Sequence, residues 1–168
     1  MTTPTATRPQ FPGGYGVPAT TAGMLDWNQI EERPVAAPVY WMATVRPDGR
    51  PHVVPRWGVW LDGRLWYDGS PETVNARNLS HEPRCVLHLE NGTEAVIIEG
   101  EATVNGDPGP EFRTRLAAAF AKYHDLGYAP GPEGWEGDNG AGLFAFTPHK
   151  ALAWFSFPTD CTRFSFEA

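Results

Sequence analysis

Hydrophobic and polar residues alternate along the middle of this chain. From residue 38 to residue 104 the spacing has a period of two, which is typical of half-buried β-strands. The stretches PDGR, LDGR and ENGT interrupt the alternation, and their Asp-Gly and Asn-Gly pairs favour tight turns. The pattern predicts an antiparallel meander, completed near the C-terminus by two or three strands in LFAFTP, KALAWFSF and CTRFSF.

Helices are expected where this alternation is absent. The predicted helical segments are residues 23–33, 70–79 and 108–124. Pro34 is expected to end the first helix because proline has no backbone N–H. Ser70 or Thr73 is expected to cap the second helix.

Two further segments are rich in proline and glycine. Residues 1–22 are expected to form a flexible N-terminal arm, and residues 23–168 a single domain. Residues 125–140 form a long acidic loop, for which two interpretations remain open: a lid over a site or a disordered segment.

These elements predict a mainly β fold with short helices. Six to seven largely antiparallel strands favour a small barrel over a doubly wound sheet. Seven tryptophans are many for 168 residues, and aromatic side chains on strand faces favour a large dimer interface or a flat ligand.

The charge and cysteine content limit the possible partners. The 13 Lys and Arg against 20 Asp and Glu give a net charge of −7, which argues against nucleic-acid binding. No apolar run is long enough for a membrane span, and the start of the chain lacks an apolar core, so a cytoplasmic protein is expected. Cys85 and His88 are three residues apart on a strand, which places them on opposite faces and makes Cys85 a core thiol.

Most catalytic and metal-binding signatures are missing. The sequence has no HExxH motif, GxSxG elbow, P-loop or paired-cysteine ligand set, so no metal site is expected. One candidate group of residues remains. It consists of Arg56 and a polar loop that contains Ser70, Thr73, Asn75, Arg77 and Asn78. It favours either an anionic-cofactor site or, equally well, a surface ion pair beside a capped helix.

The segments TVRPDGRPHVVPRWGVW, LWYDGSPETVNARNLSHEPRCVLHLE and VIIEGEATV together resemble the pyridoxamine 5'-phosphate oxidase-like family. The resemblance implies a homodimeric split β-barrel that binds FMN or the deazaflavin coenzyme F-420. It places three groups of residues at the cofactor: Val53, Val54, Pro55, Arg56 and Trp57 at the ring; Ser70, Thr73, Asn75 and Asn78 near the phosphate; and Trp154 and Phe155 from the other subunit.

The chain departs from the family pattern in its phosphate loop. Val74 and Asn75 stand where the family commonly has basic residues, so Arg56 or Arg77 is expected to compensate. The resemblance implies an oxidoreductase that transfers hydride between the cofactor and a small conjugated or heteroaromatic substrate. It assigns no catalytic residue, and among the residues His52 and Tyr67 are the candidates for protonating a reduced substrate. The alternatives are a barrel that holds a flavin, haem or tetrapyrrole without turnover, and a purely structural dimer module.

Overall fold

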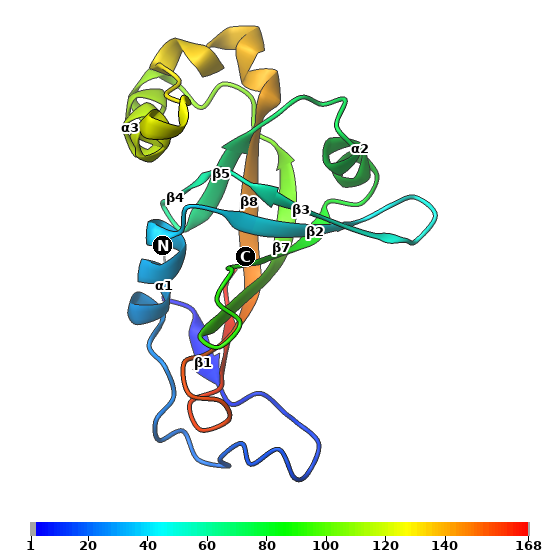
Figure 1. The fold of residues 1–168 in the computed structure, drawn as a ribbon, viewed down its shortest axis with the longest axis vertical. Coiled ribbons are helices and arrows are strands. Elements are labelled where there is room, and N and C mark those ends of the chain that lie inside the picture. Colours follow the sequence, from blue (N-terminus) through cyan, green and yellow to red (C-terminus); the bar gives the residue numbers. More distant parts are fainter. Residues whose placement is uncertain (1–2, 168) are drawn as a thin grey trace.

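The computed structural model describes residues 3–167, which form one antiparallel sheet with short helices around it (Figure 1). The described residues contain nine strands: β1 (Thr5–Thr7), β2 (Tyr40–Val45), β3 (Pro51–Arg56), β4 (Val59–Leu61), β5 (Arg64–Asp68), β6 (Arg84–His88), β7 (Ala95–Val104), β8 (Leu143–Trp154) and β9 (Thr162–Ser165). The helices are α1 (Trp27–Ala36), α2 (Val74–His81), α3 (Pro110–Phe120) and the 3-10 helices η1 (Ala121–Leu126), η2 (Pro132–Trp135) and η3 (Gly137–Gly142). None of these helices is both long and apolar enough to cross a membrane.

Strand β8 organises the sheet. The main path runs β1-β9-β8-β7-β6-β2-β3, so β3 lies at one end with β2 as its only strand neighbour. The first part of β8 also pairs with β5, which carries the β4–β5 hairpin, and its last part pairs with β9. The predicted mainly β, antiparallel split-barrel fold is confirmed.

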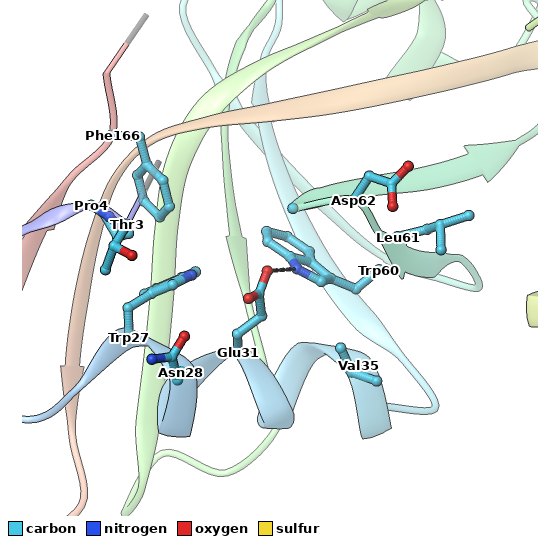
Figure 2. A pocket seen from close by; sticks show the side chains of 11 residues that line it. Thr3, Pro4, Trp27, Asn28, Glu31, Val35, Trp60, Leu61, Asp62 and Phe166 are labelled. Atoms are coloured by element: carbon cyan, nitrogen blue, oxygen red, sulfur yellow. Dashed lines mark hydrogen bonds between the residues drawn. The ribbon is translucent and has the colours of Figure 1, made fainter. Parts of the chain in front are cut away.

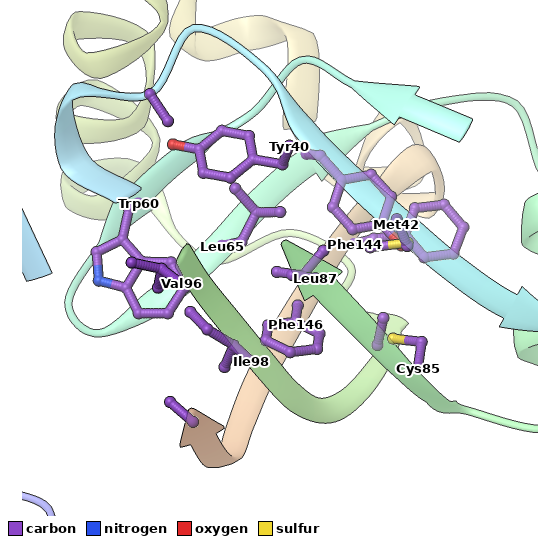
Figure 3. Close-up of a cluster of buried hydrophobic side chains, with 14 of the residues drawn as sticks. Tyr40, Met42, Trp60, Leu65, Cys85, Leu87, Val96, Ile98, Phe144 and Phe146 are labelled. Carbon is purple, nitrogen blue, oxygen red and sulfur yellow. The ribbon is translucent and has the colours of Figure 1, made fainter. Parts of the chain in front are cut away.

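In the β2–β3 hairpin the alternation of residues separates the side chains of the core from those of the surface. In β2 the side chains of Tyr40, Met42 and Thr44 are buried, whereas those of the alternate positions are partly or fully exposed. Figure 3 shows Tyr40 and Met42 among the aliphatic and aromatic side chains that fill the barrel. One face of the period-two pattern therefore forms the core, and the other faces outward.

A second, smaller core lies under α3. It contains Phe120, Tyr123 and Trp135, and Trp135 is only 1% exposed. Most of residues 125–140 therefore belong to packed 3-10 turns rather than to a disordered segment.

Three local predictions need correction or addition. Pro34 does not end α1 but lies inside it, in the last turn, where the loss of one helical hydrogen bond is tolerated. LFAFTP and KALAW form one strand, because a register shift opposite Glu99 and Gly100 accommodates Pro148. Within the segment expected to be an arm, Thr5–Thr7 form β1, which pairs with β9.

Candidate functional site

The candidate site is built on β3, the end strand of the sheet. Pro51 and Pro55 fit this position because a strand with one neighbour leaves half of its backbone N–H groups unused. The side chains of His52, Val54 and Arg56 alternate with them and are half-buried. The face of β3 that carries His52, Val54 and Arg56 therefore points toward the protein. The opposite face, with Pro51, Val53 and Pro55, points outward.

Arg56 connects β3 to the start of α2. Its Nη2 donates a hydrogen bond to Oδ1 of Asn75 at 2.7 Å, and its guanidinium carbon lies 4.9 Å from the centroid of the Tyr67 ring. Gly69 makes room for this arrangement, because a Cβ atom there would lie 2.9 Å from Nη1 of Arg56. Burial lowers the pKa of Arg56, yet arginine stays charged at every physiological pH.

This guanidinium is a cation without an anionic partner. Arg56 takes part in none of the ion pairs found among residues 3–167. Tyr67 and Asp68 partly offset the effect of burial on the pKa of Arg56, but Asp68 forms no ion pair with it. A half-buried arginine that is hydrogen-bonded to a neutral amide is suited to bind an anion.

Unpaired polar atoms lie on Arg56 and on two residues that contact it. In the described residues seven buried side-chain N or O atoms have no hydrogen-bond partner, and three of the seven are Arg56 Nε, Tyr67 Oη and Asn75 Nδ2, while a fourth, His52 Nδ1, lies farther along β3. A buried polar group without a partner costs about 1–3 kcal/mol. Their concentration on β3, β5 and α2 is what a site for a polar ligand requires.

The loop before α2 is held by its own hydroxyl groups. Thr73 caps α2 by accepting a hydrogen bond from the Ala76 N–H at 3.2 Å, and it donates one to the Ser70 carbonyl at 3.0 Å. Ser70 Oγ accepts from the Glu72 N–H at 3.1 Å. Both predicted residues thus shape the loop and lie on its exposed side.

Asn78 and Arg77 have different roles from Asn75. Asn78 is buried, and its Nδ2 donates to Oγ1 of Thr44 at 3.0 Å, which docks α2 on β2. Arg77 is exposed and donates to the Glu72 carbonyl at 3.0 Å. The structure therefore brings Arg56 and Asn75 together, and leaves Arg77 on the other side of α2.

The remaining predicted residues are spread over the outer surface. Val53 is 52% exposed, and Trp57, 40% exposed, stacks on Tyr123 with ring centroids 5.1 Å apart. Trp154 is the last residue of β8 and Phe155 follows it, and β7, β6 and β2 separate β8 from β3. Within one chain the structure does not join them to Arg56.

Two contributors to the site were missed. Gly69 carries no side-chain signal, and Tyr128, from the loop after η1, donates a hydrogen bond to Asp68 at the end of β5. The ring of Tyr128 also lies 5.9 Å from that of Trp57. Burial raises the pKa of Tyr67 and of Tyr128, so both hydroxyls remain protonated at neutral pH.

The family model for pyridoxamine 5'-phosphate oxidase matches residues 27–155, which include every element of this corner. The chain belongs to the pyridoxamine 5'-phosphate oxidase family. No curated protein sequence matches it.

Solved structures of this family's fold agree with the assignment. A conserved hypothetical protein of Mycobacterium tuberculosis is 19% identical with a TM-score of 0.60, over 79% of this chain and 87% of its own. A FAD-binding protein of Mesorhizobium loti is 19% identical with a TM-score of 0.58, over 85% and 96%. A heme-binding protein of Mycobacterium smegmatis is 21% identical with a TM-score of 0.53, over 84% and 57%. At these identities the likeness concerns the fold.

Proposed function

We propose that this protein is an oxidoreductase that uses FMN, or alternatively the deazaflavin F-420, to move hydride to or from a small conjugated or heteroaromatic substrate. The observation that carries the proposal is Arg56, a half-buried cation without a carboxylate partner beside unpaired buried polar atoms. Family membership and the fold shared with the FAD-binding protein support it.

The residues present fit the phosphate end of such a cofactor. Arg56 supplies the charge that Val74 and Asn75 lack, and Asn75 Nδ2 and the first turn of α2 offer further donors. The ring system would lie along β3, near Val53, Val54, Pro55 and Trp57. Flavins and deazaflavins supply hydride transfer when bound, and the protein orients them and shields the site.

Tyr67 is the better candidate for a hydrogen-bond donor to the reduced substrate. Its hydroxyl is unpaired, and burial raises its pKa, so the proton stays in place at neutral pH. Tyr67 would therefore donate a hydrogen bond rather than give up its proton, and it would not act as a base. His52, with an unpaired Nδ1, is the second candidate.

We further propose a homodimer formed through the outer face of the sheet. Val45 and Val53 are 42% and 52% exposed there, and Trp41 and His88 stack with ring centroids 6.3 Å apart. Such a dimer would allow Trp154 and Phe155 of a second copy to reach the cofactor. Val45→Arg should yield monomers in analytical ultracentrifugation, whereas Val104→Arg, an equally exposed valine at the end of β7, should not. Dimers of both variants would refute this interface.

The first experiment is a titration of FMN, and separately of F-420, with purified protein, followed by quenching of cofactor fluorescence. Arg56→Gln should weaken binding by about 10- to 150-fold, the value of one charge-assisted hydrogen bond. Arg163→Gln on exposed β9 is the control with the same change of charge. If neither cofactor binds to folded wild-type protein, the proposal fails.

A carrier of haem or another tetrapyrrole is the second candidate. The heme-binding protein of M. smegmatis has the same fold, which favours it. Titration with haem followed by Soret absorbance separates the two functions. Tight haem binding without catalytic reduction and reoxidation of FMN or F-420 would replace the oxidoreductase with the carrier.

A further inference from the structure

A separate pocket of about 750 Å³ lies between α1, the β4–β5 turn and the C-terminal segment (Figure 2). It shares no residue with the corner around Arg56. Its volume falls within the range of about 300–1,000 Å³ that is usual for small-molecule sites. The pocket is therefore large enough for a ligand of its own.

Three aromatic side chains form the walls of this pocket. Trp27 and Trp60 are each only 6% exposed, and the ring of Trp27 meets that of Phe166 edge to face, with centroids 4.8 Å apart. Phe164 packs against the other side of Trp27 at 5.2 Å. Because these rings are held by packing, the small part of the two tryptophans that reaches the pocket, and the partly exposed ring of Phe166, are fixed before any ligand binds.

A carboxylate lies between the rings. Figure 2 shows Glu31 rising from α1 between Trp27 and Trp60, where its Oε1 accepts a hydrogen bond from Trp60 Nε1 at 2.8 Å. This bond fixes the carboxylate but does not neutralise it. Glu31 is absent from the ion pairs of residues 3–167.

The charge of the pocket is negative. Among residues 3–167 its only other charged lining residue is Asp62, which is paired with Arg115 at 2.5 Å, and no lysine, arginine or histidine of that range lines the space. An anion would therefore meet an uncompensated carboxylate. A cation would gain the charge of Glu31 and contact with the partly exposed ring of Phe166.

We propose that this pocket binds a small organic cation, an ammonium or quaternary ammonium group attached to an apolar body. The charged nitrogen would lie beside Glu31 and near the ring of Phe166. The apolar body would fill the space toward Val35 and Leu61. The site is independent of the proposed cofactor function.

Choline and benzyltrimethylammonium are suitable probes, and 3,3-dimethylbutan-1-ol is the neutral analogue of choline. Binding can be followed by the shift of the Trp60 indole N–H signal in NMR spectra, because that proton is bonded to Glu31. The two cations should shift this signal saturably, and the neutral analogue should bind about tenfold more weakly or not at all. Equal binding of choline and its neutral analogue would overturn the proposal.

The decisive variant is Glu31→Gln. Its side-chain amide oxygen can still accept the Trp60 hydrogen bond, so the change removes charge while keeping the packing. The Kd for benzyltrimethylammonium should rise about tenfold in this variant. Glu32→Gln, on the exposed side of the same helix, makes the same change in net charge and should leave the Kd unchanged. An unaltered Kd in Glu31→Gln, or no saturable binding to the wild-type protein, would refute the site whether or not FMN binds.

Discussion

The Tyr128 hydroxyl donates a hydrogen bond to a carboxylate oxygen of Asp68, which joins the loop after η1 to the end of β5. The same ring packs between Trp57 and Phe120, with centroids 5.9 and 5.8 Å away. Asp68 directly precedes Gly69, which lies against Arg56. Tyr128 thus connects the loop to the ends of β3 and β5, which lie beside the proposed phosphate site.

Replacing Tyr128 by phenylalanine removes this attachment and keeps the ring. The loss of one hydrogen bond to a carboxylate, about 1.5–3 kcal/mol, should release the loop and speed dissociation of FMN. Stopped-flow displacement of bound FMN measures this rate. Tyr15→Phe is the control, because Tyr15 is 52% exposed in the N-terminal segment. Identical dissociation rates in both variants would show that the loop does not restrict the site.

Asn75→Asp tests the role of Arg56 without removing it. The aspartate would keep the acceptor that Arg56 now uses and turn the contact into an ion pair, so the guanidinium would be neutralised. FMN affinity should fall by about 10- to 150-fold, while riboflavin, which lacks the phosphate, should bind as before. Fluorescence titrations with both ligands measure the difference. Asn105→Asp, at an exposed position, is the control, and an equal loss of both ligands would contradict a phosphate-specific site.

Gly100→Ala should destabilise the barrel where β7 meets β8. An added Cβ would lie 2.1 Å from the Thr147 carbonyl oxygen and 2.7 Å from Cζ of Phe146, beside the register shift. Such overpacking costs about 1–3 kcal/mol of unfolding free energy or more. Urea denaturation followed by tryptophan fluorescence measures it. Gly92→Ala, which meets nothing within 4 Å, should leave the midpoint nearly unchanged, and equal midpoints for the two variants would show that the backbone adapts.

Strands could be predicted where the sequence signal lies within the strand itself or in the adjacent turn. The period-two alternation of β2 and the PDGR turn specify the pairing that places Thr44 opposite His52. β1 carries no such signal, because it is three residues long and pairs Thr5 with Ser165, near the other end of the chain. The continuity of β8 through Pro148 likewise depends on its partner strand. These features follow from tertiary pairing that a local pattern does not contain.

The sequence named candidate site residues, which stay a prediction, but it did not specify the contacts among them. Arg56 and Asn75 were both expected near the cofactor, yet their hydrogen bond exists because Asn78 docks α2 on Thr44. Helical spacing does separate Asn75 from Arg77, since residues two apart lie on different faces. That argument favours Arg56 over Arg77 as the compensating charge of the proposed phosphate site. Tyr128 reaches Asp68 from sixty positions away, and no local pattern predicts that contact.

The buried cysteine thiol and tyrosine hydroxyls should make the protein less stable in alkaline solution. Burial raises the pKa of the Cys85 thiol from 9.0 to about 12 and raises those of Tyr40 and Tyr67 above their usual value. Above pH 9 the unfolded chain therefore releases protons that the folded protein keeps, so the free energy of unfolding falls as the pH rises through this range. Urea titrations at pH 7, 9 and 10 should show a decline, and Cys85→Ala should make it shallower. The Cys85 thiol should also react with a disulfide reagent only after unfolding. A Cys85→Ala curve parallel to that of the wild type would show that this thiol does not contribute to the alkaline loss.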